Sequence, residues 1–236
     1  MDADTPGSLR VRLFGFPIVI NWSVLFIGAL IATSRLPIPA ILLFFPAAIL
    51  SILIHELGHA AVARSFGARV DSVLLYMMGG LTSWYTTSRL TRLNRIAISA
   101  AGSGVEIVLG LGVFALMRAG ALGDVAADLM SHPFDTFFWQ AGYAQQYVAY
   151  TAGVFVWVSV VWGLLNWLPI GGFDGSYMLG EFMVQRNAER GHDIARGISI
   201  AVSAVVFLYL YSTGYRSFAL LIALIAVSSL VGSKRY

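Results

Sequence analysis

The sequence predicts an all-α polytopic membrane protein, with about six transmembrane helices and a short cytoplasmic β-hairpin or re-entrant segment. Of the 236 residues, 58% are hydrophobic and 11% are charged, and the mean hydropathy is +0.78. These values lie far from the soluble globular average. The apolar residues are also gathered into separate runs. The chain has no cysteine, which excludes disulfides and thiolate metal ligands.

The apolar runs are candidates for membrane spans, because a helix needs about 20 mainly apolar residues to cross a bilayer. They lie at Phe16–Thr33, Ile38–Ala63, Ile96–Met117, Tyr147–Leu168, Ile198–Ser212 and Ser217–Val231, of which the last two are short. We expect a single integral-membrane domain over residues 1–236. Its core spans would lie at about 16–175 and its additional C-terminal spans at about 198–231, with no appended soluble module.

The basic residues set the expected orientation. With six crossings, twelve of the fifteen lysines and arginines fall on one side of the membrane, and Arg35, Arg118 and Arg216 fall on the other. The positive-inside rule therefore places both termini in the cytoplasm. This distribution explains the formal charge of +3 better than binding to nucleic acid does, so no nucleic-acid partner is expected.

Two connections between the runs have their own character. From Arg64 to Arg95, β-branched and aromatic residues lie on both sides of Gly79-Gly80, which predicts a short hairpin or re-entrant segment on the cytoplasmic side. The stretch from Gly120 to Gln146 is acidic and aromatic, and we expect it to lie along the outer membrane interface.

Residues 55–59, with the sequence H-E-L-G-H, are the most informative motif. Residues four apart share one face of a helix, so His55 and His59 can offer imidazole nitrogens to one metal ion. Glu56 is close enough to act on a water molecule at that ion. The run 38–63 is otherwise almost wholly apolar, and each ionisable group within a span costs roughly 2.5–3.5 kcal/mol on insertion scales. The motif therefore predicts one zinc ion per chain.

A catalytic zinc usually has three protein ligands, and Asp174 is the best candidate for the third. Pro169 and the glycines after it should end the fourth helix on the same cytoplasmic side as the histidines. Gly175 would let the backbone turn tightly so that the carboxylate faces the metal. The alternative for Asp174 is an ordinary turn residue. Asn166 is a candidate for contacting the substrate backbone or a developing oxyanion, although a hydrogen bond between helices explains it almost as well.

These motifs resemble the site-2 protease family of intramembrane zinc metalloproteases, in the compact bacterial and archaeal type without a PDZ or CBS domain. That family pairs H-E-x-x-H in one transmembrane helix with N-x-x-P and an L-D-G-type motif in a later one. Here the later motifs lie at Asn166–Pro169 and Asp174-Gly175, and the opening residues 14–23 are also similar. The resemblance implies integral membrane placement, in the prokaryotic cytoplasmic membrane, with the active site toward the cytoplasmic side.

The resemblance also implies what the protein acts on. Expected partners are the lipid bilayer and transmembrane protein substrates such as membrane-tethered transcription regulators or anti-sigma factors. The hairpin edge around Gly79 and Gly80 would hold the substrate as an added strand. The chain departs from the family at Phe173, where leucine is usual, and at residues 101–106, where many members have A-G-P-x-x-N. Glu106 in this segment is a candidate for contacting the site or substrate; the alternatives are an ion pair with an arginine or a protonated carboxyl.

The expected activity is that of a zinc metalloendopeptidase that hydrolyses peptide bonds within or near transmembrane segments. In this hypothesis His55, His59 and Asp174 hold the zinc, and Glu56 takes a proton from water and passes it to the leaving amine. Other readings stay open. A zinc or proton transporter also places histidines and carboxylates at membrane depth. A non-catalytic membrane scaffold would need neither Glu56 nor Asp174, and the histidines would then be a buried pair bonded to neighbouring carbonyls.

Overall fold

The computed structural model describes residues 7–26, 38–77, 79–120 and 144–232. The chain divides into two compact units. The first comprises Met1–Thr87 and Ala101–Gly163, and the second comprises Ser88–Ala100 and Leu164–Tyr236.

A four-stranded sheet lies in the first unit, in the order β1 (Ser8–Leu13), β2 (Phe16–Asn21), β3 (Arg69–Tyr76) and β4 (Gly79–Tyr85). The β1–β2 and β3–β4 pairs are antiparallel, whereas β2 and β3 are parallel. Phe14 and Gly15 join β1 to β2 with φ angles of 52° and 81°, the positive values that a tight two-residue hairpin turn requires. The hairpin predicted between residues 64 and 95 is confirmed as β3 and β4.

The first predicted span, from Phe16, is wrong at its start. Residues 16–21 form β2, followed by the short 3-10 helix η1 (Trp22–Val24), and residues 27–37 lie outside the described part of the chain. A short apolar run fits a buried strand as well as a helix, and periodicity alone does not separate the two. Here pairing with β1 on one side and β3 on the other decides for the strand.

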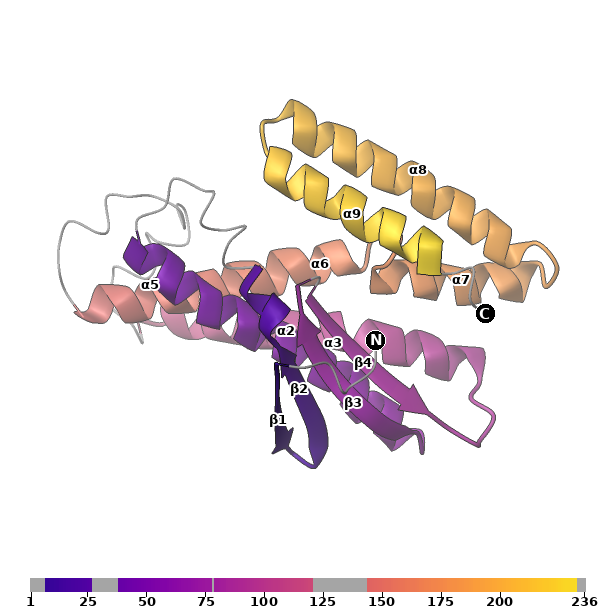
Figure 1. Ribbon diagram of the computed structural model, residues 1–236, viewed down its shortest axis with the longest axis horizontal. Helices are drawn as coiled ribbons and strands as arrows, with labels where there is room; N and C mark the ends of the chain where they lie inside the picture. The colour runs from indigo at the N-terminus through magenta and orange to yellow at the C-terminus, as the bar shows by residue number, and fades with distance from the viewer. Residues whose placement is uncertain (1–6, 27–37, 78, 121–143, 233–236) are drawn as a thin grey trace. The chain divides into compact units, whose positions relative to one another are not determined.

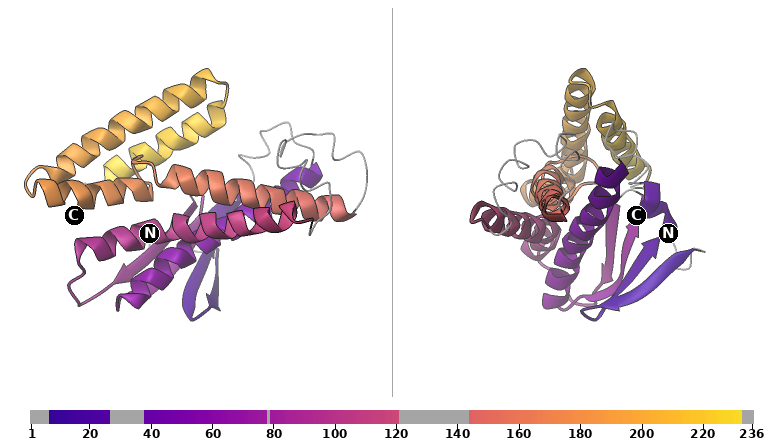
Figure 2. Two further views of the ribbon diagram at one scale, coloured as in Figure 1. Left: turned by 180° about the vertical axis from the view of Figure 1, so that it is seen from behind. Right: turned by 90° about the vertical axis from the view of Figure 1, so that its left-hand side faces the viewer.

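Helix α2 (Ile38–Ser65) connects η1 to β3 and lies along the sheet, as the views in Figures 1 and 2 show. Ala60 of α2 is fully buried and packs with Phe16, Ile18 and Val73 of the strands, with Leu57 at the edge of this cluster. The N-terminal half of α2 packs on the helix that follows residue 143. Helix α2, which carries the H-E-L-G-H motif, thus lies between the parallel strands β2 and β3 in the order of the chain.

The next helices along the chain confirm the third and fourth predicted spans. Helix α3 (Arg92–Arg118) has its residues up to Ala100 in the second unit and the rest in the first. Helices α5 (Ala144–Trp157), η3 (Val158–Trp162) and α6 (Gly163–Asn166) run on directly from one another, and η3 is a π-helical segment. Most of the predicted outer-interface stretch, residues 121–143, lies outside the described residues.

The second unit is built from α7 (Asp174–Arg186), α8 (Gly191–Ser212) and α9 (Arg216–Gly232). In Figure 1, α8 and α9 form an antiparallel pair, and α7 packs against α8. The predicted helix break after Asn166 is confirmed, whereas α7 was not predicted, because its mixed polar and apolar sequence resembles no span.

Four helical stretches of the described chain are long and apolar enough to cross a membrane: Ile41–Ser65, Arg92–Arg118, Tyr147–Asn166 and Gly191–Ser212. They match the second to fifth predicted spans. The sixth corresponds to a shorter apolar helical stretch, Phe218–Ser229. The predicted class therefore holds in its coarse form, a mostly helical membrane protein, with a small sheet larger than the expected hairpin.

Candidate metal centre

Helix α2 brings two imidazole rings and a carboxyl group together within an apolar environment. His55, Glu56 and His59 are 6%, 5% and 8% exposed. The two histidine rings meet edge to face, and their Nε2 atoms are 3.0 Å apart. One helical turn separates the residues, so this convergence follows from the i, i+4 spacing.

The space at these nitrogens fits a zinc ion. Zinc binds imidazole nitrogen at about 2.0–2.1 Å in tetrahedral geometry, which places two such nitrogens about 3.3 Å apart. The observed separation is close to that value. Gly102 of α3 faces the pair, and a Cβ at this position would lie 2.9 Å from His55 Nε2 and closer still to His59 Nε2. The absence of a side chain at Gly102 keeps this space open.

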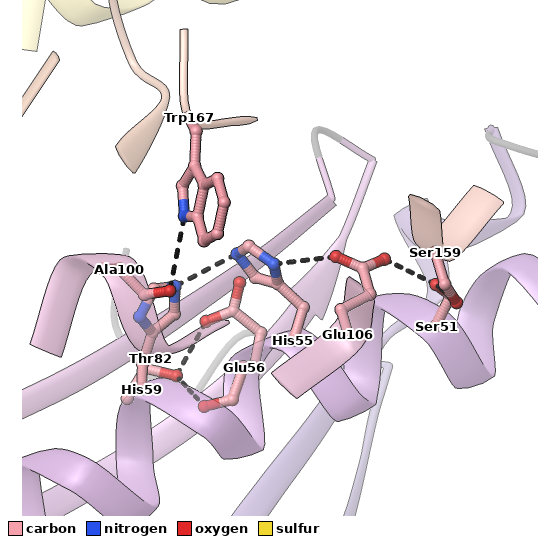
Figure 3. A network of polar contacts seen from close by, with 9 residues as sticks. All are labelled: Ser51, His55, Glu56, His59, Thr82, Ala100, Glu106, Ser159 and Trp167. Carbon is pink, nitrogen blue, oxygen red and sulfur yellow. Dashed lines mark hydrogen bonds and ion pairs between the residues drawn. The ribbon is translucent and has the colours of Figure 1, made fainter. Parts of the chain in front are cut away.

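The other ring nitrogen of His55 is held by a buried carboxyl group. Glu106 Oε2 is 3.0 Å from His55 Nδ1, and Ser51 donates a hydrogen bond of 2.5 Å to Glu106 Oε1 (Figure 3). Ser159 on η3 is hydrogen-bonded to Ser51, with the two Oγ atoms 2.8 Å apart. Glu106 therefore contacts a residue of the site, His55, which was one of the alternatives left open. Its predicted contact with substrate stays a prediction.

Glu56 is held by the sheet. Thr82 on β4 donates a hydrogen bond of 2.7 Å to Glu56 Oε2, and its hydroxyl also lies 2.9 Å from the Glu56 backbone carbonyl oxygen (Figure 3). Gly80 lies against the same side chain, because a Cβ on Gly80 would overlap Glu56 Cγ and Oε1. The beginning of β4, at Gly79 with φ 119°, therefore adjoins the proposed base, as a hairpin edge near the site requires.

Asp174 lies in the second unit, as the first residue of α7. The loop before it turns at Gly172, whose φ is +89°. Gly175 lies inside the helix and packs onto the backbone carbonyls of Trp167 and Leu168, where any Cβ would collide. The turn that we expected at Gly175 is thus made by Gly172, and Gly175 instead allows a close backbone approach.

The rest of this loop is tied to its own unit. The backbone N–H of Gly171 donates to Ser203 Oγ on α8 at 3.2 Å, and a Cβ at Gly172 would lie 2.8 Å from Ile225 Cγ2 on α9. Trp167 Nε1 donates to the carbonyl oxygen of Ala100 at 3.3 Å (Figure 3). Asn166 is half-buried at the last position of α6, and nothing in the described residues tests its predicted contact with substrate.

Sequence reasoning missed the residues that hold the site in place. Thr82 carried no signal, since one threonine in a strand is ordinary. A serine in a membrane helix is usually a packing residue, but in the structure Ser51 bonds to Glu106 and to Ser159. The only available signal was the polar character of Ser51 and Glu106 within otherwise apolar runs.

The fold and the site together define a class: a membrane protein with an H-E-x-x-H helix in which both histidines and the glutamate are buried side by side. The chain belongs to peptidase family M50, whose model matches residues 43–210.

Named relatives share the sequence over part of their length. "Putative zinc metalloprotease Rip3" of Mycobacterium tuberculosis is 27% identical over 223 residues, which is 88% of this chain and 51% of the relative. "Zinc metalloprotease MJ0392" of Methanocaldococcus jannaschii is 28% identical over 112 residues, 44% of this chain and 31% of the relative. The matched part of this chain therefore spans about half the length of Rip3 and about a third of the length of MJ0392.

The fold is similar to that of a solved structure. The site-2 protease from Methanocaldococcus jannaschii has a TM-score of 0.59 and 21% sequence identity, with 94% of both chains covered. With four membrane-length apolar helices and membership of this family, the chain is an integral membrane protein.

Proposed function

We propose that this protein is a zinc-dependent intramembrane endopeptidase that hydrolyses peptide bonds within or near transmembrane segments of membrane-tethered substrates. The observation that carries the proposal is the buried pair of His55 and His59, with converging Nε2 atoms, next to a buried Glu56 in an apolar helix. Membership of peptidase family M50 and the names of the relatives support it.

The proposed ligand set is His55 Nε2, His59 Nε2 and an Asp174 carboxylate oxygen. When bound, zinc lowers the pKa of a water molecule to about 7 and polarises a carbonyl group. Glu56 then accepts a proton from water and donates it to the leaving amine. Thr82 holds the Glu56 carboxyl group for this transfer. Asp174 is assigned from the sequence motif and from its exact placement by Gly172 and Gly175 at the start of α7.

The position of β4 supports the proposed substrate class. A peptide bond in a helix is shielded by its own hydrogen bonds, so a substrate helix must unwind before cleavage. In the described sheet β4 is an edge strand, and its first residues adjoin Glu56. An unwound segment that pairs with this edge as an added strand would present its backbone beside the base. Substrates would be single-span proteins such as membrane-tethered transcription regulators or anti-sigma factors.

The finer topology belongs to the same proposal. Because residues 16–21 form β2, a first crossing would have to follow Asn21, and α9 would be the last. With six crossings in all, the positive-inside rule places both termini and the site on the cytoplasmic side. Cysteine introduced at Ser8 and labelled from each side of sealed vesicles tests this placement. Labelling only from the cytoplasmic side is expected, and labelling only from the outside would contradict it.

The test of the activity is a co-expression assay with a panel of tagged single-span substrates, using wild-type protein and Glu56→Gln. The variant is expected to keep about one zinc per chain and lose cleavage, because it keeps the ligands and loses the base. Glu189→Gln, the same change at an exposed glutamate, is the matched control and should cleave normally. Cleavage by Glu56→Gln would refute the assignment, and zinc flux in liposomes without cleavage would favour a transporter.

A further inference from the structure

We propose that Glu106 is a positioning residue that fixes the orientation and the tautomer of His55. The proposal rests on the zinc site proposed above and deepens it. It assigns to Glu106 no contact with substrate. Its consequence is that a carboxyl group on α3 keeps the His55 lone pair directed at the metal space, through a chain of buried hydrogen bonds that ends on the π-helical segment η3.

Burial makes these hydrogen bonds obligatory. The side chains of Glu106, Ser51 and Ser159 are fully buried, at 0% exposure. A buried carboxyl group without partners is strongly unfavourable, so its two oxygens must be satisfied by protein donors. The structure provides one for each: Ser51 Oγ for Oε1 and His55 Nδ1 for Oε2.

For an ionised Glu106, the direction of each bond in the network follows from counting protons. Ser51 has one hydroxyl proton, which it donates to Glu106, so Ser159 must be the donor in the Ser159–Ser51 bond. Glu106 therefore has a fixed donor on one oxygen. Its other oxygen lies 3.0 Å from His55 Nδ1, and a carboxylate oxygen has no proton to donate, so Nδ1 would be the donor. With the proton on Nδ1, His55 Nε2 carries its lone pair on the side where His59 and Gly102 lie.

The backbone around Glu106 is shaped for this contact. A Cβ at Gly163 would lie 2.7 Å from Ile107 Cγ1 and 3.5 Å from Glu106 Oε2, and a Cβ at Gly110 would lie 2.8 Å from Ser159 Cβ. Two glycines thus let α3 and the η3–α6 segment approach closely. Ser159 itself lies in η3, and single π-helical turns often occur where a side chain must be placed for function.

The test uses the full chain in detergent and two measurements, zinc affinity by competition with a chelator and the ¹⁵N shifts of the histidines in the zinc-free protein. The chain has four histidines, so a histidine-labelled spectrum is small enough to assign with His132→Gln and His192→Gln. The wild type is expected to show His55 with its proton on Nδ1. Glu106→Ala is expected to show a mixture of tautomers and to bind zinc about 10–100-fold more weakly.

A conservative variant separates positioning from loss of bulk. Glu106→Gln keeps an amide oxygen that can accept from Nδ1, so it should retain the His55 tautomer and bind zinc with an affinity between those of the wild type and Glu106→Ala. Glu181→Ala removes an ion-paired carboxylate outside this network and is the matched control, with unchanged zinc affinity. If Glu106→Ala fails to fold, Ser51→Ala tests the same network and should weaken zinc binding in the same direction.

The outcomes separate this inference from the proposed function. Wild-type zinc affinity and an unchanged His55 tautomer in Glu106→Ala would overturn the positioning role while leaving the zinc site intact. If Glu106→Ala does not fold, wild-type zinc affinity in both Ser51→Ala and Glu106→Gln would overturn it. Absence of zinc binding by the wild type would instead refute the proposed function, and the tautomer of the zinc-free protein would still decide the role of Glu106.

Discussion

The two units of the chain place their functional groups by different physical means. In the first unit, His55 and Glu56 are held by side-chain hydrogen bonds from Glu106 and Thr82. In the second, Asp174 is placed by backbone shape, through Gly172 and the close approach at Gly175. Sites of the first kind should be sensitive to the loss of a polar partner, and sites of the second kind to the addition of a single methyl group.

The histidines themselves should show the largest effect. His59→Ala removes one of the two proposed imidazole ligands and is expected to abolish both zinc binding and cleavage, since two remaining ligands hold a catalytic zinc poorly. His192→Ala, at an exposed histidine of α8, is the matched control and should change neither. Mass spectrometry measures the zinc content of both variants, and cleavage of a tagged single-span substrate measures their activity. A His59→Ala protein that retains stoichiometric zinc would remove His59 from the ligand set.

Gly102 tests whether zinc binding in the first unit also depends on the absence of a side chain at one position. Gly102→Ala places a Cβ against both Nε2 atoms, so we expect zinc affinity to fall at least 100-fold, in line with the loss of a correctly placed ligand. Gly112→Ala on the same helix has no heavy atom within 4 Å of its new Cβ and should bind zinc normally. Equal zinc affinities for the two variants, by chelator competition, would show that the space at Gly102 is not the metal space.

Gly175 tests the second kind of placement. Its Cβ would collide with the carbonyls of Trp167 and Leu168, so Gly175→Ala should lower the free energy of unfolding by about 1–3 kcal/mol and reduce cleavage. Gly197→Ala is the control: its Cβ meets nothing within 4 Å, and a helical alanine should be about 0.5–1 kcal/mol more stable than glycine. Denaturation in mixed micelles measures both. A Gly175→Ala protein more stable than the wild type would contradict the close backbone approach at Gly175.

Thr82 should give the smallest effect. Thr82→Val keeps the shape and removes the hydrogen bonds to Glu56, which are worth about 1–1.5 kcal/mol, so kcat is expected to fall about tenfold. Zinc content should not change, because Thr82 is hydrogen-bonded to Glu56, which is not one of the proposed ligands. Thr82→Ser restores the hydroxyl and should recover most of the activity. A Thr82→Val enzyme with unchanged kcat would show that Glu56 is positioned by other contacts.

The same contrast explains what the sequence predicted. The spacing of His55, Glu56 and His59 is local, so helical geometry alone brings them together. The break after Asn166 was equally readable, because proline and glycine act on the backbone where they occur. The pairing of Phe16–Asn21 with β1 and β3 was not readable, since it depends on residues far along the chain and a short apolar run fits either structure.

Glu106 shows most clearly what the sequence alone could not predict. The sequence indicated that a carboxyl group within a span needs a reason, and it left several partners open. Only the register between α2, α3 and η3 decides that Ser51 and His55 are those partners. A glycine in a membrane helix indicates close packing, but the sequence does not reveal that the two Nε2 atoms are the neighbours of Gly102.

The most direct test of the central claim is X-ray absorption at the zinc edge of the purified chain, with Asp174→Asn beside the wild type. The account predicts about one zinc per chain in the wild type, bound by two imidazoles and a carboxylate oxygen, and weakened binding in Asp174→Asn. A coordination shell with fewer than two imidazoles, or an unchanged shell and affinity in Asp174→Asn, would contradict the ligand set of His55, His59 and Asp174.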